Sequence, residues 1–501
     1  MLVMSSRRRW FVTAGVMTGM LLAALEATVV GTAMPTIVSV LRGVEHYSWV
    51  FSAYLLTSTV TVPVWGKLSD LFGRRRLFQI GVAVFVIGSA ACGLAQTMTQ
   101  LIVARAVQGV GAGALVPLAM TIIGDIFTLE ERAKMQGFFS GVWGLSSIFG
   151  PLVGGFITDQ LSWRWVFLLN LPVGIAAALI IGFALREPQR HERPSIDYLG
   201  AAVLTVAVTI LLLVFGAQNL ATPRNMVLIA LVVGSLFWFI RIERRAKDPV
   251  VPLTLFRNRV VAVAVGVGFL CGIAMFAVIT FVPLLAQGVL GKTATEAGSF
   301  LTPLMLSWVI VSIIGGRLLI RFGSRVLVIL GLILMLAGFI ALATFTHATP
   351  PALMMFELVV IGSGLGLTMF TLLVASQHSV PRDQLGITTS LNQFSRSIGG
   401  ALGVAILGAL LAAGLAQFAQ DPNALVNPEA RAHIAPAELA QLQGALEGTL
   451  QNIFWTCAAV VAIALAGAFA LPGGGVVDEA HGERMVIAEM TNIDPDHEPE
   501  A

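Results

Sequence analysis

Long apolar runs alternate with short polar segments along the whole chain. A helix needs about 20 apolar residues to cross the hydrocarbon core of a membrane. Fourteen stretches of roughly that length occur, bounded by charges, prolines or glycine clusters. They predict an all-α polytopic membrane protein with transmembrane helices at approximately 10–33, 48–69, 77–95, 100–123, 135–157, 164–185, 197–216, 225–241, 260–286, 298–316, 326–345, 352–375, 388–416 and 450–471.

The composition excludes a water-soluble globule, because 57% of the residues are hydrophobic, 11% are charged and the mean hydropathy is +0.88. The three cysteines lie inside apolar stretches, and neither a metal-ligand spacing nor a cofactor motif is present. Residues 109–114 match a loose dinucleotide-binding pattern, but no strand precedes them, so they predict helix packing. A net charge of +3 is too small to indicate nucleic acid as a partner. Without a catalytic constellation, we do not expect an enzyme.

The basic residues predict the orientation of the chain in the membrane. With fourteen spans, 23 of the 30 Lys and Arg residues fall on the side of the termini and five on the other side, while Arg105 and Arg396 lie within spans. Basic residues concentrate in cytoplasmic loops. Both termini are therefore expected to be cytoplasmic, in the inner (plasma) membrane of the cell. The lipid bilayer is thus one partner, and the sequence leaves the oligomeric state open.

A repeat with an offset of 250 residues divides the chain. The segment 66–75 recurs as 316–325, and Gly150 corresponds to Gly400 at the same offset. The repeat predicts two six-helix bundles with two extra helices between them. The expected organisation is a cytoplasmic N-terminus (1–9), an N-terminal bundle (10–185), two additional helices with their linkers (186–258), a C-terminal bundle (259–471) with an outer loop (419–449), and an acidic, disordered cytoplasmic tail (472–501).

Within the outer loop, leucines at helical spacing between Pro436 and Gly448 predict a short helix on the membrane surface.

The loop between the second and third spans combines turn-forming and charged residues. Gly66 and Gly73 are expected at tight turns, and Arg74 and Arg75 face a negative leaflet. Asp70 could pair with these arginines or cap a helix of the other bundle, and so lock one conformation. The alternative is a generic positively charged cytoplasmic loop.

Charged side chains inside spans are expensive and indicate functional sites. Glu26 lies about 24 Å along the first span and Arg105 about 8 Å from the outer end of the fourth, so both belong to the outer half. We expect them to be neighbours, with Arg105 holding Glu26 ionised until a proton or cationic substrate competes. Gln108 adds a polar group one turn away. A static structural ion pair is the alternative.

Three further polar residues lie in the predicted C-terminal bundle. Glu357 is either a second protonatable site or a side chain that reaches the membrane interface. Asn392 and Arg396 make one face of the thirteenth span polar, which fits a cavity wall, a buried helix contact or an arginine that extends to the interface.

The fifth span contains a glycine-rich notch. Gly150 and Pro151, followed by Gly154 and Gly155, remove side-chain bulk from one face and one backbone hydrogen bond. The helix is expected to bend there and to pack closely against a neighbour, with or without a role in transport.

These residues resemble the major facilitator superfamily, and within it the fourteen-span drug:proton antiporters. Segment 66–76 is similar to the cytoplasmic gate signature, 105–111 to the proton-coupling motif and 150–155 to the antiporter motif. Segments 25–35 and 163–172 are similar to signatures of the fourteen-span subfamily. Glu26 stands where aspartate is usual, and Ile320 replaces the aspartate in the second copy of the gate loop, so only the N-terminal copy carries the full set of charges.

The resemblance implies export of hydrophobic, cationic drugs or other amphipathic compounds by alternating access, driven by the proton gradient without a bound cofactor. Protons and small hydrophobic or cationic molecules are then the partners. Export of a lipid or a specific metabolite on the same fold is the first alternative. A membrane-embedded receptor or enzyme is the second, although the outer loop and the tail offer little room for a soluble domain.

Overall fold

The chain folds into long helices that run roughly side by side. The structure, a computed structural model, describes residues 5–127, 129–185, 198–215, 223–246, 253–381, 384–415 and 436–472. These residues form no strands, and their helices are α1 (Ser6–Leu41), α2 (Tyr47–Phe72), α3 (Arg74–Leu94), α4 (Met98–Ile126), α5 (Leu129–Gln160), α6 (Arg164–Leu168), α7 (Asn170–Ala184), α8 (Tyr198–Phe215), α9 (Pro223–Glu243), α10 (Arg259–Leu284), α11 (Ala294–Ala343), α12 (Pro351–His378), α13 (Leu385–Leu415) and α15 (Pro436–Ala468), with short turns at Val44–His46, Leu253–Arg257 and Leu285–Val289.

Each predicted span coincides with one of these helices, with the short pair α6 and α7, or with one arm of the kinked α11. Within the described ranges, eleven helical segments are long and apolar enough to cross a membrane. The predicted tail (472–501) lies outside the described residues, apart from its first residue, as do residues 419–435 of the predicted outer loop.

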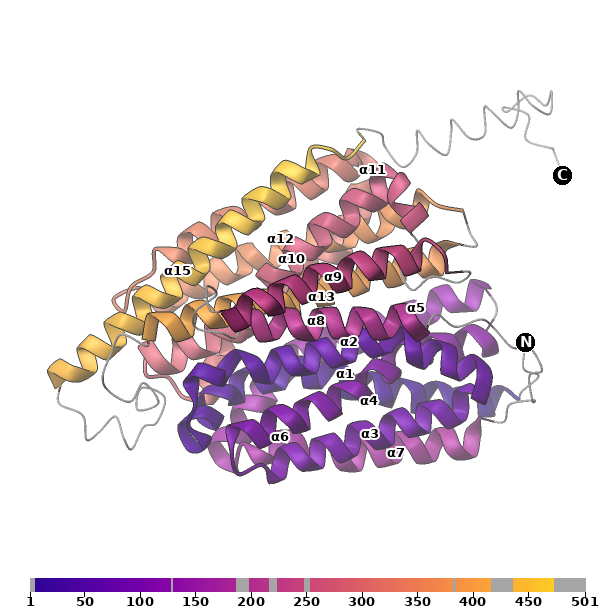
Figure 1. Cartoon of the computed structure of the whole chain (residues 1–501), viewed down its shortest axis with the longest axis horizontal. Helices are drawn as coiled ribbons and strands as arrows, with labels where there is room; N and C mark the ends of the chain where they lie inside the picture. Colours follow the sequence, from indigo (N-terminus) through magenta and orange to yellow (C-terminus); the bar gives the residue numbers. More distant parts are fainter. Residues whose placement is uncertain are drawn as a thin grey trace.

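The helices form two groups (Figure 1). Helices α1 to α7 make up the lower, indigo to purple half of the view, and α10 to α15 the upper half, which runs from pink through orange to yellow. Helices α8 and α9 pack on each other, and α8 contacts both α2 and α13. Apolar side chains from all four meet there, including Leu56 of α2, Val203 of α8, Phe239 of α9 and Ala405 of α13. The extra pair of helices therefore covers the seam where α2 meets α13.

Glycines in left-handed conformations mark the ends of the molecule. Gly73 (φ 89°) joins α2 to α3, and Gly323 (φ 75°), 250 residues later, kinks α11. We call the end that carries Ser5, Gly73 and Gly323 the proximal end, and the end that carries Gly43 and Gly291 the distal end. The predicted repeat is thus present in the backbone itself.

The expectation of a tight turn at Gly66 was wrong. Gly66 lies inside α2, which continues to Phe72, and there is open space where its side chain would be. A single left-handed residue is enough to reverse the chain, and Gly73 supplies it.

Glycines also bring neighbouring helices into close contact within each group. A Cβ atom at Gly81 of α3 would overlap Ala114 of α4. At the equivalent position, a Cβ atom at Gly331 of α11 would lie 2.8 Å from the carbonyl oxygen of Gly364 of α12. Small residues permit this approach of helices in a membrane, where association depends on packing.

The predicted surface helix between Pro436 and Gly448 is instead the first part of α15, which continues without interruption to Ala468. Leu442 and Leu446 of this part are buried in the core, and Gln443 donates a hydrogen bond to the carbonyl oxygen of Val289 (3.0 Å). The leucine spacing was interpreted correctly as helical, but the apolar face packs on protein rather than on lipid headgroups. With 33 residues, α15 is about 50 Å long, and it extends past the other helices at the left of Figure 1.

Candidate functional site

A buried ion pair lies inside the helix group α1 to α7. Glu26 of α1 and Arg105 of α4 are each only 2% exposed, and Arg105 donates from Nη1 to Oε1 of Glu26. The predicted contact between these two residues is therefore confirmed. The distance of each residue from the end of its predicted span was sufficient to place both at the same depth in the membrane.

Arg105 is held by several groups besides Glu26. Its Nε donates to the carbonyl oxygen of Val50 (3.2 Å), and its guanidinium carbon lies 4.1 Å from the centre of the Tyr54 ring. The ring of Phe167 lies 5.8 Å away on another helix. A cation in contact with aromatic faces and a carbonyl oxygen recovers part of the hydration free energy that burial removes.

A small hydrogen-bonded network completes the cluster. Arg105 Nη1 also donates to Oε1 of Gln108 (2.6 Å), and Gln108 Nε2 donates to Oγ of Ser89 (2.7 Å). Asn170 Nδ2 donates to Oε2 of Glu26 (2.7 Å) and lies 2.9 Å from the same Ser89 oxygen. Four helices, α1, α3, α4 and α7, thus contribute to one connected site, which we call the polar cluster.

Ser89, Asn170 and Tyr54 were not predicted as members of this site. Asn170 falls within segment 163–172, whose resemblance to a subfamily signature was noted without a role for this residue. It is a lone amide within an apolar stretch, at the first position of α7. That combination is the signal that could have found it, because an unpaired amide is costly in a membrane. Ser89 and Tyr54 carry no comparable signal.

Glycines of α4 set the position of Gln108. A Cβ atom at Gly109 would lie 2.5 Å from the carbonyl oxygen of Tyr54, and one at Gly113 would lie 2.6 Å from that of Ser58, so α4 packs closely on α2. On the opposite side, a Cβ atom at Gly88 of α3 would lie 2.8 Å from Cβ of Gln108. The glycine-rich segment thus packs helices, as predicted, and directs Gln108 toward Ser89.

The notch of α5 contacts both helix groups. Gly150 and Gly154 face α1, where a Cβ atom at Gly154 would lie 2.6 Å from the carbonyl oxygen of Val29. Gly155 and Pro151 face α11, with a Cβ atom at Gly298 positioned 2.7 Å from the carbonyl carbon of Pro151. The predicted close packing is present, on two sides rather than one.

The two groups are joined at the distal end. The carboxylate of Asp159, at the end of α5, accepts hydrogen bonds from the backbone N–H groups of Ala294 (3.1 Å) and Thr295 (2.8 Å) and from Oγ1 of Thr295 (2.5 Å). Negative charge at the start of a helix is favourable. Tyr47 donates to the carbonyl oxygen of Thr280 (2.8 Å), and Gln287 to that of Thr32 (2.9 Å). These contacts close the distal end in this conformation.

At the proximal end, Arg74 pairs with Asp125 at the end of α4 and donates to the carbonyl oxygen of Thr121 (2.8 Å). Asp125 was not among the predicted residues. Asp70 belongs to the last turn of α2, but its side chain lies outside the described part of the chain. Arg75, the residue that follows Arg74, is half-buried. Arg74 therefore ties α3 to α4 within one group.

Glu357 lies inside the other group. Its side chain belongs to α12 and is 7% exposed, and among the described residues its Oε2 atom has no hydrogen-bond partner. The side chain therefore packs against protein, and the alternative in which Glu357 reaches the membrane interface stays a prediction. Its proposed protonation stays a prediction.

Asn392 and Arg396 of α13 are half-buried. Asn392 donates to Oγ of Ser376 (3.0 Å) and joins α13 to α12, whereas Arg396 contacts Gln393 one turn away. Asn392 thus makes a helix contact. That these residues line a cavity stays a prediction.

The fold, the buried polar cluster and the paired bundles define a membrane transporter. Residues 16–404 match the family model of the Major Facilitator Superfamily, and the chain belongs to this family. Membership indicates a transporter rather than an enzyme. The match covers more than three quarters of the chain, from the first half of α1 into α13.

Two similar curated proteins come from Bacillus subtilis (strain 168). The multidrug transporter protein MdtP is 41% identical over 457 residues, which cover 90% of this chain and 84% of the relative. Multidrug resistance protein 3 is 35% identical over 467 residues, which cover 89% of this chain and 91% of the relative.

Solved structures share the fold. A bacterial homolog of the human lysosomal transporter Spinster, in an inward-facing conformation, aligns with a TM-score of 0.65 at 19% identity and covers 93% of this chain and 98% of its own. A D-xylose-proton symporter aligns with a TM-score of 0.61 at 14% identity, covering 93% and 98%.

Proposed function

We propose that the protein is a fourteen-span drug:proton antiporter of the plasma membrane. It exports hydrophobic, cationic compounds by alternating access between the two bundles, and both termini are cytoplasmic. The multidrug names of its relatives support the substrate class, and the distribution of Lys and Arg supports the orientation.

The burial and pairing of Glu26 carry this proposal. The carboxylate of Glu26 is 2% exposed and is paired with an equally buried arginine. Burying these charges in a membrane protein costs free energy, so their presence indicates that the charge has a function. Asn170 and Arg105 both donate hydrogen bonds to its carboxylate. A proton that binds Glu26 weakens both interactions and frees Arg105 to move. Glu26 is thus suited to exchange a proton against a cationic substrate.

The helix that carries Glu26 connects the polar cluster to the distal junction. Thr28, two residues further along α1, donates to the carbonyl oxygen of Ser146 on α5 (3.2 Å). Helix α5 then reaches α11 through Gly155 and Asp159. A change of charge at Glu26 that shifts α1 therefore acts on the contacts that hold the distal end closed.

The energy of a proton gradient is adequate for this change. One pH unit corresponds to about 1.4 kcal/mol, and 100 mV to about 2.3 kcal/mol for each charge. Together they are comparable to one or two hydrogen bonds to charged groups.

The direct test is efflux of a lipophilic cationic dye from energised membrane vesicles that contain Glu26→Gln. We expect proton-driven efflux to be lost at normal protein abundance, because the amide cannot exchange a proton. Glu26→Asp keeps the carboxyl group and is the matched control, with retained efflux. Unchanged proton-coupled efflux with Glu26→Gln would remove Glu26 from the mechanism.

A screen of transported compounds separates the alternatives. If neutral lipids or a single metabolite are exported and cationic dyes are not, the drug:proton assignment is wrong although the fold is the same. Ligand-dependent proton release in detergent distinguishes antiport from passive binding.

The orientation is tested by labelling introduced cysteines, because all three native cysteines are buried. Gln96→Cys lies in the exposed distal turn between α3 and α4, and Arg244→Cys at the exposed proximal end of α9. We expect a membrane-impermeant maleimide to label Gln96→Cys in intact cells and Arg244→Cys only after permeabilisation. The opposite pattern would reverse the proposed topology.

A further inference from the structure

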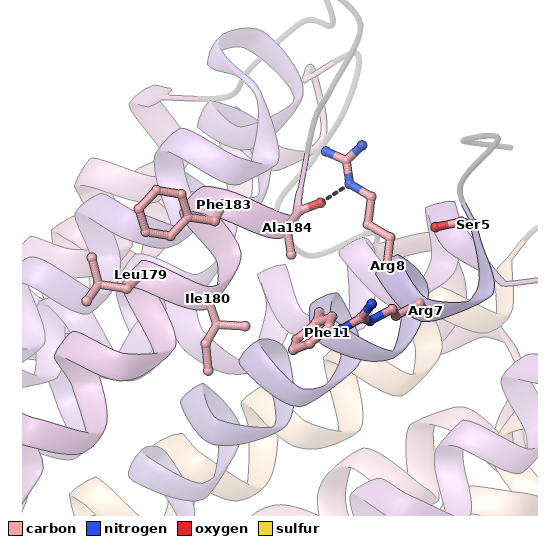
Figure 2. A pocket seen from close by; sticks show the side chains of 8 residues that line it. All are labelled: Ser5, Arg7, Arg8, Phe11, Leu179, Ile180, Phe183 and Ala184. Carbon is pink, nitrogen blue, oxygen red and sulfur yellow. Dashed lines mark hydrogen bonds between the residues drawn. The ribbon is translucent and has the colours of Figure 1, made fainter.

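A cavity lies between the start of α1 and the end of α7, at the proximal end of the molecule and far from the polar cluster (Figure 2). Its volume is about 540 Å³, and its walls include Arg7, Arg8 and Phe11 of α1 and Leu179, Ile180 and Phe183 of α7. None of the described residues that line it is acidic. Neither the proton nor the drug pathway proposed above uses this cavity.

One rim of the cavity is cationic. Arg8 donates from Nε to the carbonyl oxygen of Ala184 (2.6 Å), which fixes its guanidinium beside the last turn of α7, and its two terminal nitrogens point away from that bond in Figure 2. The guanidinium carbon of Arg7 lies 6.0 Å from the centre of the Phe11 ring. Arg7 and Arg8 thus each place a guanidinium group on the lining of the cavity, that of Arg8 at α7 and that of Arg7 at the Phe11 ring.

The walls below the rim are apolar and face outward. Phe11 is 52% exposed, Leu179 53% and Phe183 83%. Large exposed apolar side chains on transmembrane helices contact acyl chains. The cavity thus offers positive charge at the level of the headgroups and an apolar surface directly below it.

We propose that this cavity binds an anionic phospholipid, with the phosphate at Arg7 and Arg8 and the acyl chains along Phe11, Leu179 and Phe183. Basic pockets between transmembrane helices suit the headgroups of anionic lipids. A free phosphate would leave the apolar walls uncovered. A cationic drug would be repelled by the two arginines, so the occupant differs in charge from the transported compounds.

The bound lipid contacts both α1 and α7 and holds their proximal ends together. The same two helices meet again at the bond between Glu26 and Asn170. Glu26 lies about 27 Å from Arg8 along α1, and Asn170 about 21 Å from Ala184 along α7. The lipid therefore holds the proximal ends of two helices whose more distal parts carry the polar cluster, and it adds to the stability of the folded protein.

The experiment measures lipid retention and thermal unfolding of the purified full-length chain in detergent. The probes are phosphatidylglycerol, phosphatidylcholine with the same acyl chains, and inorganic phosphate. We expect native mass spectrometry to show retained phosphatidylglycerol, which also raises the unfolding temperature, whereas the other two probes do neither. Each arginine contributes about a fivefold gain in affinity for the anionic lipid.

The double variant Arg7→Gln/Arg8→Gln is expected to lose the retained phosphatidylglycerol. Arg244→Gln, which removes an exposed arginine at the proximal end of α9, is the matched control and keeps it. Equal binding by the double variant and this control would overturn the proposal. So would protection by inorganic phosphate equal to that by phosphatidylglycerol, because the site would then bind a free anion.

Two further variants keep the test decisive if the double variant fails to fold. Arg7→Lys/Arg8→Lys preserves the charge and is expected to retain the lipid. Phe183→Gln changes only an exposed wall residue, and we expect it to weaken phosphatidylglycerol severalfold. Unchanged affinity in Phe183→Gln would overturn the placement of the acyl chains. These measurements do not involve transport, so their outcome is independent of the proposed antiport.

Discussion

At the 250-residue offset that relates the two bundles, Gly81 and Gly88 of α3 correspond to Gly331 and Gly338 of α11, and both pairs press against the next helix. Most of the polar cluster has no such counterpart. Four of its five members, Glu26, Ser89, Arg105 and Gln108, correspond to Phe276, Phe339, Met355 and Leu358.

The difference separates two kinds of residue. The glycines are shared because each bundle needs the same close helix contacts. The polar residues are present in one bundle because a buried charge network is expensive and is kept only where it acts. The buried acid of the second bundle, Glu357, stands at a position equivalent to Val107, so it is not a copy of Glu26. Proton coupling is therefore expected to be asymmetric.

The largest predicted effect on stability is that of Arg105→Met. This substitution gives the first bundle the residue that the second bundle has at the equivalent position, Met355. Arg105→Met leaves Glu26 buried without its cation, and we expect a loss of about 3 to 5 kcal/mol of stability together with loss of proton-driven efflux. Thermal unfolding in detergent measures the first effect. The double variant Glu26→Gln/Arg105→Met is the control and should recover part of the stability. If Arg105→Met is as stable as the unmodified protein, the ion pair is not a stabilising contact.

The second prediction compares equivalent glycines. A Cβ atom at Gly88 would press on Gln108, and one at Gly338 would lie 3.2 Å from the carbonyl oxygen of Glu357. We expect Gly88→Ala and Gly338→Ala each to lower stability by about 1 to 3 kcal/mol. Only Gly88→Ala should also reduce dye efflux per folded molecule, because it displaces a member of the polar cluster. Equal losses of efflux would contradict the asymmetry.

The third prediction concerns one of the contacts through which the two bundles meet at the distal end. Asp159→Asn removes the negative charge that accepts hydrogen bonds at the start of α11. We expect the equilibrium between conformations with a closed and an open distal end to shift about tenfold toward the open one, which corresponds to about 1.4 kcal/mol. Spin labels at Gln96 and Thr346, in distal turns of different bundles, report the separation by electron resonance. Glu296→Gln is the control, since Glu296 pairs with Lys292 of its own bundle. An unchanged distance distribution would show that Asp159 does not hold this end.

The smallest effect is expected at Gly66. It lies in a helix with nothing within 4 Å of the position of a Cβ atom, so Gly66→Ala should raise stability by about 0.5 to 1 kcal/mol. Gly73→Ala is the contrast, because its positive φ is strained for alanine. A destabilised Gly66→Ala protein would mean that this glycine is required after all.

The sequence predicted the helices and the repeat because apolar length and periodicity are local properties. It also placed Glu26 beside Arg105, since depth along two spans is enough to bring rare charges to one level. It did not place Ser89 or Asn170 in the polar cluster. The lone amide of Asn170 marks that residue as unusual in an apolar stretch, but an isolated polar residue does not indicate which helix it faces. The errors at Gly66 and at residues 436–448 have a related origin. A glycine or a leucine period does not reveal where a helix ends or what it packs against.

The long helix α15 extends past the other helices of the second bundle and offers a surface to which a probe can bind. Its first turns are fixed to that bundle through Gln443 and through the pair formed by Glu447 and His347. A small antibody fragment that binds these turns would move with the second bundle, and its binding site lies away from the polar cluster. The bound fragment would then report any change in the angle of α15 relative to the first bundle.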